Sequence, residues 1–119
     1  MLNALKAKDL ATRWLQAANT HDIEKILSFY AQDAELESPV VVKLMNEPSG
    51  RIRGMDKLRE YFTKGFAAYP HMSLHLIEAA WGLFSITAWY ANHRGTRTSA
   101  YLELDASGKI RRNVSHYNE

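Results

Sequence analysis

Apolar residues in the first half of the chain recur at helical spacing. The first stripe consists of Leu10, Trp14, Ala17 and Ala18. The second consists of Ile23, Ile26, Leu27 and Tyr30. The third, which follows Gly54, consists of Leu58, Tyr61, Phe62 and Phe66. Residues three and four positions apart share a helix face, so these stripes predict three helices, over 8–18, 20–30 and 55–69.

The stretch between the second and third stripes has the character of a strand and a turn. Residues 34–38 read as a strand that Pro39 stops, and Val40-Val41-Val42 extends or restarts it. Residues 46–50 are turn formers. We expect one strand and a turn before the third helix.

Beyond Pro70 the pattern changes to the alternation of β-strands. The predicted strands cover 72–76, 84–93, 98–104 and 110–117. Helices followed by a run of strands are typical of an α+β fold with a mostly antiparallel sheet.

The last two strands form a hairpin around the loop 105–108. A four-residue loop pairs Leu104 with Lys109 and, counting outward, Leu102 with Arg111. In this register one face carries Arg111, Asn113, Ser115 and Tyr117, whereas a bulge at Gly108 would exchange the faces of the last strand. Both faces are half apolar. We therefore expect one to cover the helices and the other to meet a partner.

Composition narrows the class of protein. The 119 residues are 46% hydrophobic and 24% charged, which suits one globular domain over 1–119. The chain has no cysteine, which excludes disulfides and thiolate chemistry. Its net charge of +2 is scattered, so we expect no nucleic-acid partner. No apolar run is long enough to span a membrane, and the N-terminus lacks a signal-peptide core, so we expect a cytoplasmic protein.

The histidines do not form a metal-binding pattern. His71 and His75 would lie roughly 13 Å apart along a strand, too far to share one ion. We find no phosphate-binding loop either, and expect neither metal nor cofactor. His93 is a candidate general base at a pocket mouth because it shares strand parity with Trp89. The alternative is an exposed histidine of the turn before Gly95.

Two stretches resemble a known family. They are WLQAANTHDIEKILSFYAQDAELESP, at 14–39, and YLELDASGKIRRNVSHY, at 101–117. Both are similar to SnoaL-like proteins and ketosteroid isomerases of the nuclear transport factor 2-like superfamily. The resemblance implies a cone in which a curved sheet and three helices enclose an apolar pocket. It also implies a homodimer formed through the outer face of the sheet.

The residues depart from the chemistry of those relatives. Ketosteroid isomerases use an aspartate base with a tyrosine and a protonated aspartic acid; Trp14, Ser38 and Ala100 stand at these positions here. Limonene epoxide hydrolases use an Arg-Asp-Asp set, for which the last strands offer no inward aspartate. SnoaL-like cyclases rely on an acidic residue on a late strand, where Asn113 and Ser115 stand here.

The resemblance and the strand parities together predict the lining of the pocket. The expected lining residues are Trp14, Tyr30, Ser38, Tyr61, Trp89, Ala100, Asn113, Ser115 and Tyr117. Glu37 becomes a second candidate general base if its strand slips by one residue and replaces Ser38 in the pocket. Arg111 either points inward toward an anion or is a solvated charge of the sheet.

Two functions from different classes follow. One is a cofactor-free enzyme that isomerises, cyclises or hydrates a small, largely apolar substrate, with cyclic molecules among the alternatives. The other is a non-catalytic ligand-binding or dimerisation module, which the missing titratable residues favour. A pocket carboxylate or histidine with a shifted pKa indicates the enzyme, and a lining of apolar and neutral polar groups indicates the module.

Overall fold

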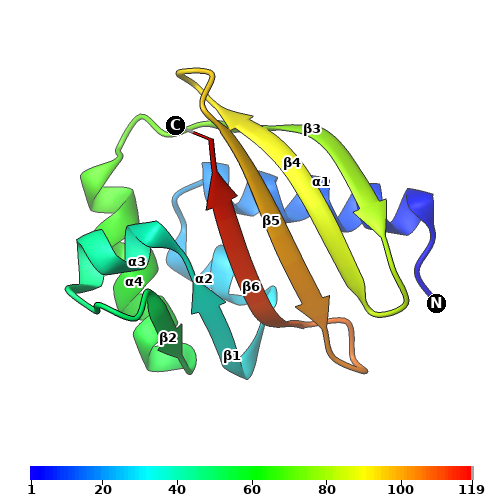
Figure 1. Cartoon of the computed structure of the whole chain (residues 1–119), viewed down its shortest axis with the longest axis horizontal. Coiled ribbons are helices and arrows are strands. Elements are labelled where there is room, and N and C mark those ends of the chain that lie inside the picture. The colour runs from blue at the N-terminus through cyan, green and yellow to red at the C-terminus, as the bar shows by residue number, and fades with distance from the viewer. Residues whose placement is uncertain (119) are drawn as a thin grey trace.

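The computed structural model describes residues 1–118, which form four helices and six strands (Figure 1). In chain order these are α1 (Ala4–Asn19), α2 (Ile23–Leu27), β1 (Tyr30–Glu37), α3 (Pro39–Met45), β2 (Arg51–Arg53), α4 (Met55–Ala68), β3 (Leu74–Trp81), β4 (Ser85–Asn92), β5 (Arg97–Leu104) and β6 (Ile110–Tyr117). None of the described helices is long and apolar enough to cross a membrane.

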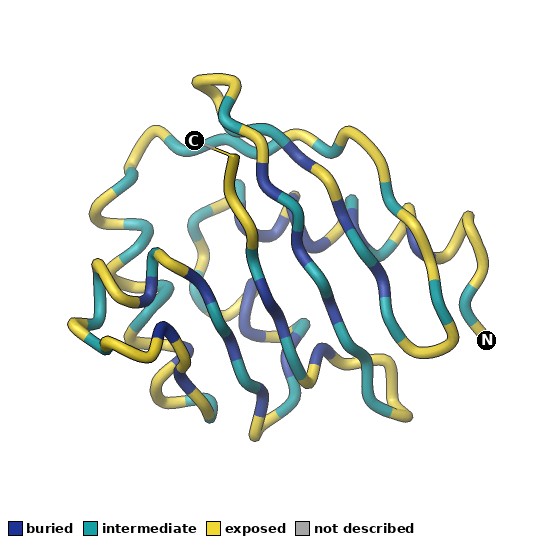
Figure 2. The backbone as a smooth tube through the Cα atoms, viewed as in Figure 1, coloured by how far each residue is buried: buried dark blue, intermediate teal, exposed yellow. Residues whose placement is uncertain are grey.

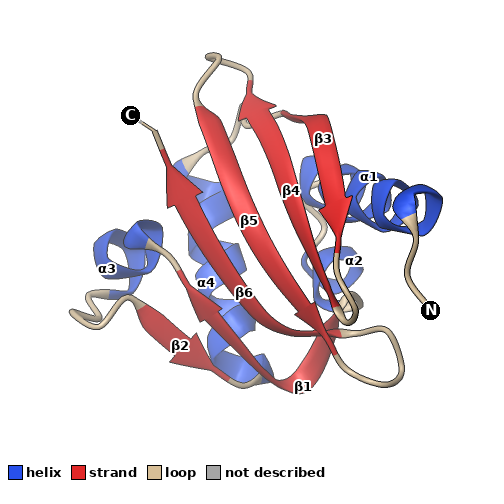
Figure 3. Cartoon of the chain, turned by 45° about the vertical axis from the view of Figure 1, so that its right-hand side comes forward, coloured by secondary structure: helices blue, strands red, loops and turns tan. Residues whose placement is uncertain are grey.

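The six strands form one curved, open sheet in the order β2-β1-β6-β5-β4-β3. All neighbours pair antiparallel except β1 and β6, which are parallel. Helices α1, α2 and α4 lie behind the sheet, and α3 lies beside its β1–β2 edge (Figures 1 and 3). The expected α+β class and the cone-shaped sheet are therefore confirmed, with four helices in place of three.

Short helices and turns account for most boundary differences. α1 begins four residues before the predicted start because the Asn3 side chain accepts a hydrogen bond from the Lys6 backbone at 2.8 Å. α2 ends at Leu27, not at Tyr30, and the Asp22 side chain caps it. The chain then enters β1 at once, because the Ile110 amide donates to the Phe29 carbonyl at 2.8 Å.

The expectation of a strand at Val40-Val41-Val42 is wrong, since these residues lie in α3. The Ser38 hydroxyl caps the helix by accepting from the Val40 amide at 3.1 Å. Pro39 has the φ angle that a first helical residue needs. Asn46, at φ 55°, ends the helix. A cap and a proline thus override the β preference of three valines.

The predicted register of the last hairpin is also wrong, by one residue at Leu104 and by two residues from Leu102 outward. Leu104 pairs with Ile110, Leu102 with Asn113 and Ala100 with Ser115, with an irregularity at Glu103–Leu104. Arg111 is the extra residue and turns outward, where its Nε lies 2.6 Å from Glu103. The bulge restores the parity of the rest of β6, so Asn113 and Ser115 still face the helices.

The core lies between the inner face of the sheet and the helices (Figure 2). Inward positions of the central strands, such as Ile86, Ala88, Ala100 and Leu102, are almost completely buried. On α1, Ala7 and Ala11 are also 0% exposed. The small alanine side chains allow the first part of α1 to lie close to the sheet. Larger side chains follow toward the C-terminal end of α1, where a space remains between the helix and the sheet.

Candidate functional site

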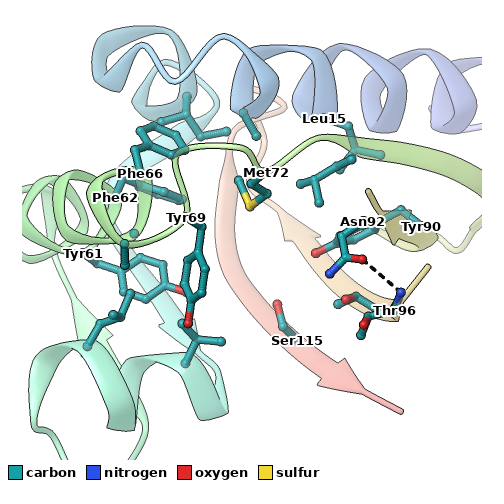
Figure 4. Close-up of a pocket in the computed structure, with 18 of the residues that line it drawn as sticks. Leu15, Tyr61, Phe62, Phe66, Tyr69, Met72, Tyr90, Asn92, Thr96 and Ser115 are labelled. Carbon is teal, nitrogen blue, oxygen red and sulfur yellow. Dashed lines mark hydrogen bonds between the residues drawn. The ribbon is translucent and has the colours of Figure 1, made fainter. Parts of the chain in front are cut away.

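A cavity of about 370 Å³ lies between the helices and the inner face of the sheet. Trp14 and Leu15 of α1 line it. Figure 4 shows Leu15 beneath α1 and Tyr61, Phe62 and Phe66 of α4 along one side. Its size falls in the range of small-molecule sites, about 300–1,000 Å³.

Aromatic rings dominate the wall. Phe62 is central, with ring centroids 5.7 Å from Tyr30, 5.3 Å from Tyr61 and 6.0 Å from Phe66. On the sheet side Trp14 meets Tyr90 edge to face at 5.8 Å. Such contacts fix the rings in place, so the cavity presents a preformed apolar surface.

A chain of hydrogen bonds crosses the buried end of the cavity. The Trp14 indole donates to the Tyr30 hydroxyl at 3.2 Å, which in turn donates to Asn113 Oδ1 at 2.9 Å. Asn113 Nδ2 continues the chain to the Ser115 hydroxyl at 3.4 Å. The Tyr30 hydroxyl therefore donates its hydrogen bond to Asn113 and not to a ligand, and this phenol stabilises the cavity wall.

The buried phenols remain protonated near neutral pH. Burial raises the pKa of Tyr30, against a smaller lowering by the hydrogen bond from Trp14. Burial likewise raises the pKa of Tyr61 and of Tyr90, with opposing hydrogen bonds that involve Ser38 and Ser115 respectively. Neutral phenols donate or accept hydrogen bonds but do not act as bases.

The opening of the cavity is formed by two loops. One follows α4 and contributes Tyr69, His71 and Met72; the other joins β4 to β5 and contributes His93 and Arg94. Figure 4 shows Tyr69 on one side of the space and Asn92 and Thr96 on the other. His71, His93 and Arg94 are exposed, which marks this end as the one that solvent reaches.

The structure brings together most of the residues that the sequence nominated. Those that line the cavity are Trp14, Tyr30, Tyr61, Asn113, Ser115 and Tyr117. His93 lines the opening, although it lies in the turn after β4.

Four nominated residues lie elsewhere. Trp89 is on the outer face, 38% exposed, because its neighbour Tyr90 takes the inward position of β4. Ala100 faces inward but is completely covered, and Ser38 is a buried helix cap. Glu37 points outward and binds Arg51 at 2.7 Å, so the register slip that would bring it into the pocket does not occur.

Sequence reasoning missed several lining residues. The sequence could have identified Tyr90, because three apolar residues of that strand, Ile86, Ala88 and Tyr90, share one parity, whereas the other parity has two, Trp89 and Ala91. No comparable sequence pattern marks Arg94 and Thr96, because only the folded sheet brings the loop between β4 and β5 to the cavity. In the part of the chain that the structure describes, no three His, Asp or Glu residues lie close enough together to hold a metal ion.

Comparison with known proteins agrees with this architecture. The family model described as the SnoaL-like domain matches residues 11–112. A SnoaL-like protein of unknown function from Burkholderia thailandensis has a TM-score of 0.91 and 26% identity over 98% of both chains. No curated protein matches the sequence significantly.

Two more distant structures share the fold. The epoxide hydrolase/cyclase-like enzyme SalBIII, described for pyran ring formation in the polyether salinomycin, has a TM-score of 0.76 and 19% identity over 99% of this chain and 95% of its own. A putative ketosteroid isomerase from Kribbella flavida has a TM-score of 0.71 and 19% identity, over 98% and 80% of the two chains. With a family model that covers most of its length, this chain belongs to the SnoaL-like family.

Proposed function

We propose that the protein binds a small, largely apolar molecule in the aromatic cavity and does so without catalysis. The observation that carries this proposal is the lining itself: within residues 1–118 it includes no aspartate and no glutamate. Its buried hydroxyls are neutral, and that of Tyr30 is occupied by Asn113. Such a wall can hold and orient a flat apolar molecule, but it offers no buried acid or base.

The proposal is tested with a neutral aromatic probe, methyl 2-naphthoate, titrated into the protein by calorimetry. We expect saturable one-to-one binding. Gly65 of α4 lines the cavity, and a methyl group added to it meets only Leu44, at 3.7 Å. Gly65→Leu should fill part of the space and weaken binding, whereas the matched control Gly65→Ala should bind almost as the parent does. Absence of saturable binding by the parent protein contradicts the proposal.

A cofactor-free enzyme is the second candidate, and the position of His93 favours it. This imidazole lines the opening, and histidine is the most common general acid–base residue of enzymes. The fold is shared with SalBIII, whose description names pyran ring formation. Turnover of a cyclic epoxide or a cyclic enone that is lost in His93→Gln, with binding of methyl 2-naphthoate intact, would favour the enzyme over the binding module.

The outer face of the sheet is proposed to pair with a second copy of the chain. It exposes Trp89 at 38% and Ile77 at 49%. The same face carries both signs of charge, as in the pairs Arg51–Glu37 and Arg111–Glu103. A face with apolar and mixed charged parts can be complementary to itself across a twofold axis.

A further inference from the structure

Charge is distributed unevenly along the cavity. Its deep end is lined by rings and neutral polar groups, among them Tyr90, Thr98 and Asn113, all of which are buried. Among the described residues, the only lining side chain with a fixed charge is the guanidinium of Arg94, at the opening. No carboxylate from the described residues lines the cavity to balance it.

Arg94 differs from most other arginines of the chain. Six of the eight arginines lie within 4.0 Å of a carboxylate, in the pairs Arg13–Asp9, Arg51–Glu37, Arg53–Asp33, Arg59–Glu24, Arg111–Glu103 and Arg112–Glu35. Across residues 1–118, Arg94 and Arg97 make no such pair, and only Arg94 lines the cavity. The guanidinium at the opening is therefore available to an anion from solution.

The loop that carries Arg94 is well ordered by hydrogen bonds. Asn92 Oδ1 accepts from the backbone amides of Arg94 at 2.9 Å and Thr96 at 3.0 Å. The Asn92 carbonyl accepts from Gly95, whose φ of 85° suits glycine. The dashed line in Figure 4 marks the Asn92–Thr96 bond beside the space. The turn thus holds the base of the Arg94 side chain at the rim.

Two histidines accompany Arg94 at the opening. His93 precedes Arg94 on the same loop, and His71 comes from the loop after α4. Both loops lie at the same end of the molecule (Figure 1). Within residues 1–118 the two loops thus contribute one guanidinium, two imidazoles and the phenol of Tyr69 to the lining, and no carboxylate that would repel an anion.

We infer that the ligand is amphipathic, with an apolar body in the cavity and a single carboxylate at the opening against Arg94. The inference rests on the proposed function and specifies its ligand class. A guanidinium presents a fork of donors that matches a carboxylate. The reverse orientation would bury a charge among neutral phenols with no cation, which is costly. A cationic ligand would meet Arg94 as a like charge.

The volume sets the size of the body. At about 30 Å³ for a group the size of a water molecule, the cavity holds on the order of a dozen heavy atoms. A bicyclic aromatic acid has this size and the flat shape of the ring-lined walls. We therefore choose 2-naphthoate as the probe, with methyl 2-naphthoate as its neutral counterpart and 2-naphthylmethylammonium as its cationic one.

The experiment compares the dissociation constants of the three probes by calorimetry at pH 7.5 and low salt, for the parent, Arg94→Gln and Arg97→Gln. Arg97 is the matched control, since it has the same charge three positions away and does not line the cavity. We expect the parent to prefer the carboxylate to the ester by about fivefold, the scale of a partly exposed ion pair. Arg94→Gln should remove this preference and leave the ester unchanged, and Arg97→Gln should keep it.

Each other outcome overturns the inference in a distinguishable way. Equal binding of acid and ester by the parent, or a preference that survives Arg94→Gln, refutes the anionic ligand class while the apolar cavity stands. Equal losses in Arg94→Gln and Arg97→Gln assign the effect to overall charge, not to the opening. Tighter binding of the ammonium probe reverses the predicted sign. If none of the three binds, the proposed function fails together with the inference.

Discussion

Replacing Tyr30 with phenylalanine removes one oxygen atom from the middle of a buried hydrogen-bond chain. That oxygen accepts from the Trp14 indole and donates to Asn113. The three residues are 6%, 3% and 2% exposed in the order Trp14, Tyr30, Asn113, so neither remaining partner lies at the protein surface. The substitution leaves an indole N–H and an amide oxygen without their partner, and adds no bulk.

The magnitude follows from the number of groups left unsatisfied. Each buried polar atom that loses its partner costs about 1–3 kcal/mol. Two such atoms, one of them beside a cavity that water can enter, give an expected loss of about 2–4 kcal/mol in the free energy of unfolding. For a domain of this size, roughly 4 °C per kcal/mol, the midpoint of thermal unfolding should fall by about 8–16 °C.

Urea denaturation followed by circular dichroism measures this change. Tyr69→Phe is the matched control, because Tyr69 is only partly buried and lies at the opening; its effect should stay within about 0.5 kcal/mol. The double variant Tyr30→Phe/Asn113→Leu should be more stable than the sum of the single changes predicts, by about 1–2 kcal/mol, since both partners of one bond are gone.

The expected loss of stability is refuted if Tyr30→Phe costs less than about 0.5 kcal/mol, the level of a substitution that breaks no important contact. It is equally refuted if the double variant shows no coupling. Either result would mean that water in the cavity already satisfies these groups.

The remaining predictions concern pH, a glycine and the outer face. Burial raises the pKa of Tyr30, Tyr61 and Tyr90 in the folded protein. Near pH 10 the unfolded chain therefore loses these protons while the folded chain keeps them. Because the unfolded state then binds fewer protons, the free energy of unfolding falls as the pH rises above about 10. Urea titrations between pH 7 and 11 should show full stability below pH 9 and a decline above pH 10, and a flat profile would contradict this sign. Gly65→Ala, within α4 and with its nearest neighbour 3.7 Å away, should raise stability by about 0.5–1 kcal/mol, and a loss would show that the cavity wall tolerates no added methyl. Trp89→Glu should convert the proposed dimer to a monomer in sedimentation velocity with little change in the folded spectrum; a parent protein that sediments as a monomer at high micromolar concentration would remove the dimer proposal.

Much of the fold was accessible from local patterns, and the differences have local causes. The apolar stripe of α4 and the alternation of β4, β5 and β6 predicted those elements within a few residues. Helix α3 and strand β2 are absent from the predicted elements, because α3 rests on the Ser38 cap and on Pro39, and the short strand β2 exists only through pairing with Glu35–Glu37. Neither signal appears in hydrophobic periodicity.

For the candidate site, too, some predicted residue positions agree with the structure and others do not. The predicted pairing puts Asn113, Ser115 and Tyr117 of β6 on the inner face. The observed pairing differs by one residue at Leu104 and by two residues beyond the bulge at Arg111, and a shift of two residues keeps the same face. Parity on β4 was assigned to Trp89 when Tyr90 holds the inward position. The parity that Tyr90 shares with Ile86 and Ala88 favours it over Trp89, and the structure shows Tyr90 packed edge to face against Trp14.

The sequence by itself determined the class of fold, the absence of cysteine chemistry and the loss of the acids that related enzymes use, because these depend on residue identity and on spacing along the chain. Only the tertiary structure decided which phenols are buried and already hydrogen-bonded, and which loops meet at the opening. Tyr30 and Asn113 are 83 positions apart, and His71 and Arg94 come from different connections. Contacts of that kind arise from the curvature of the sheet and the lie of the helices across it, which no local pattern encodes.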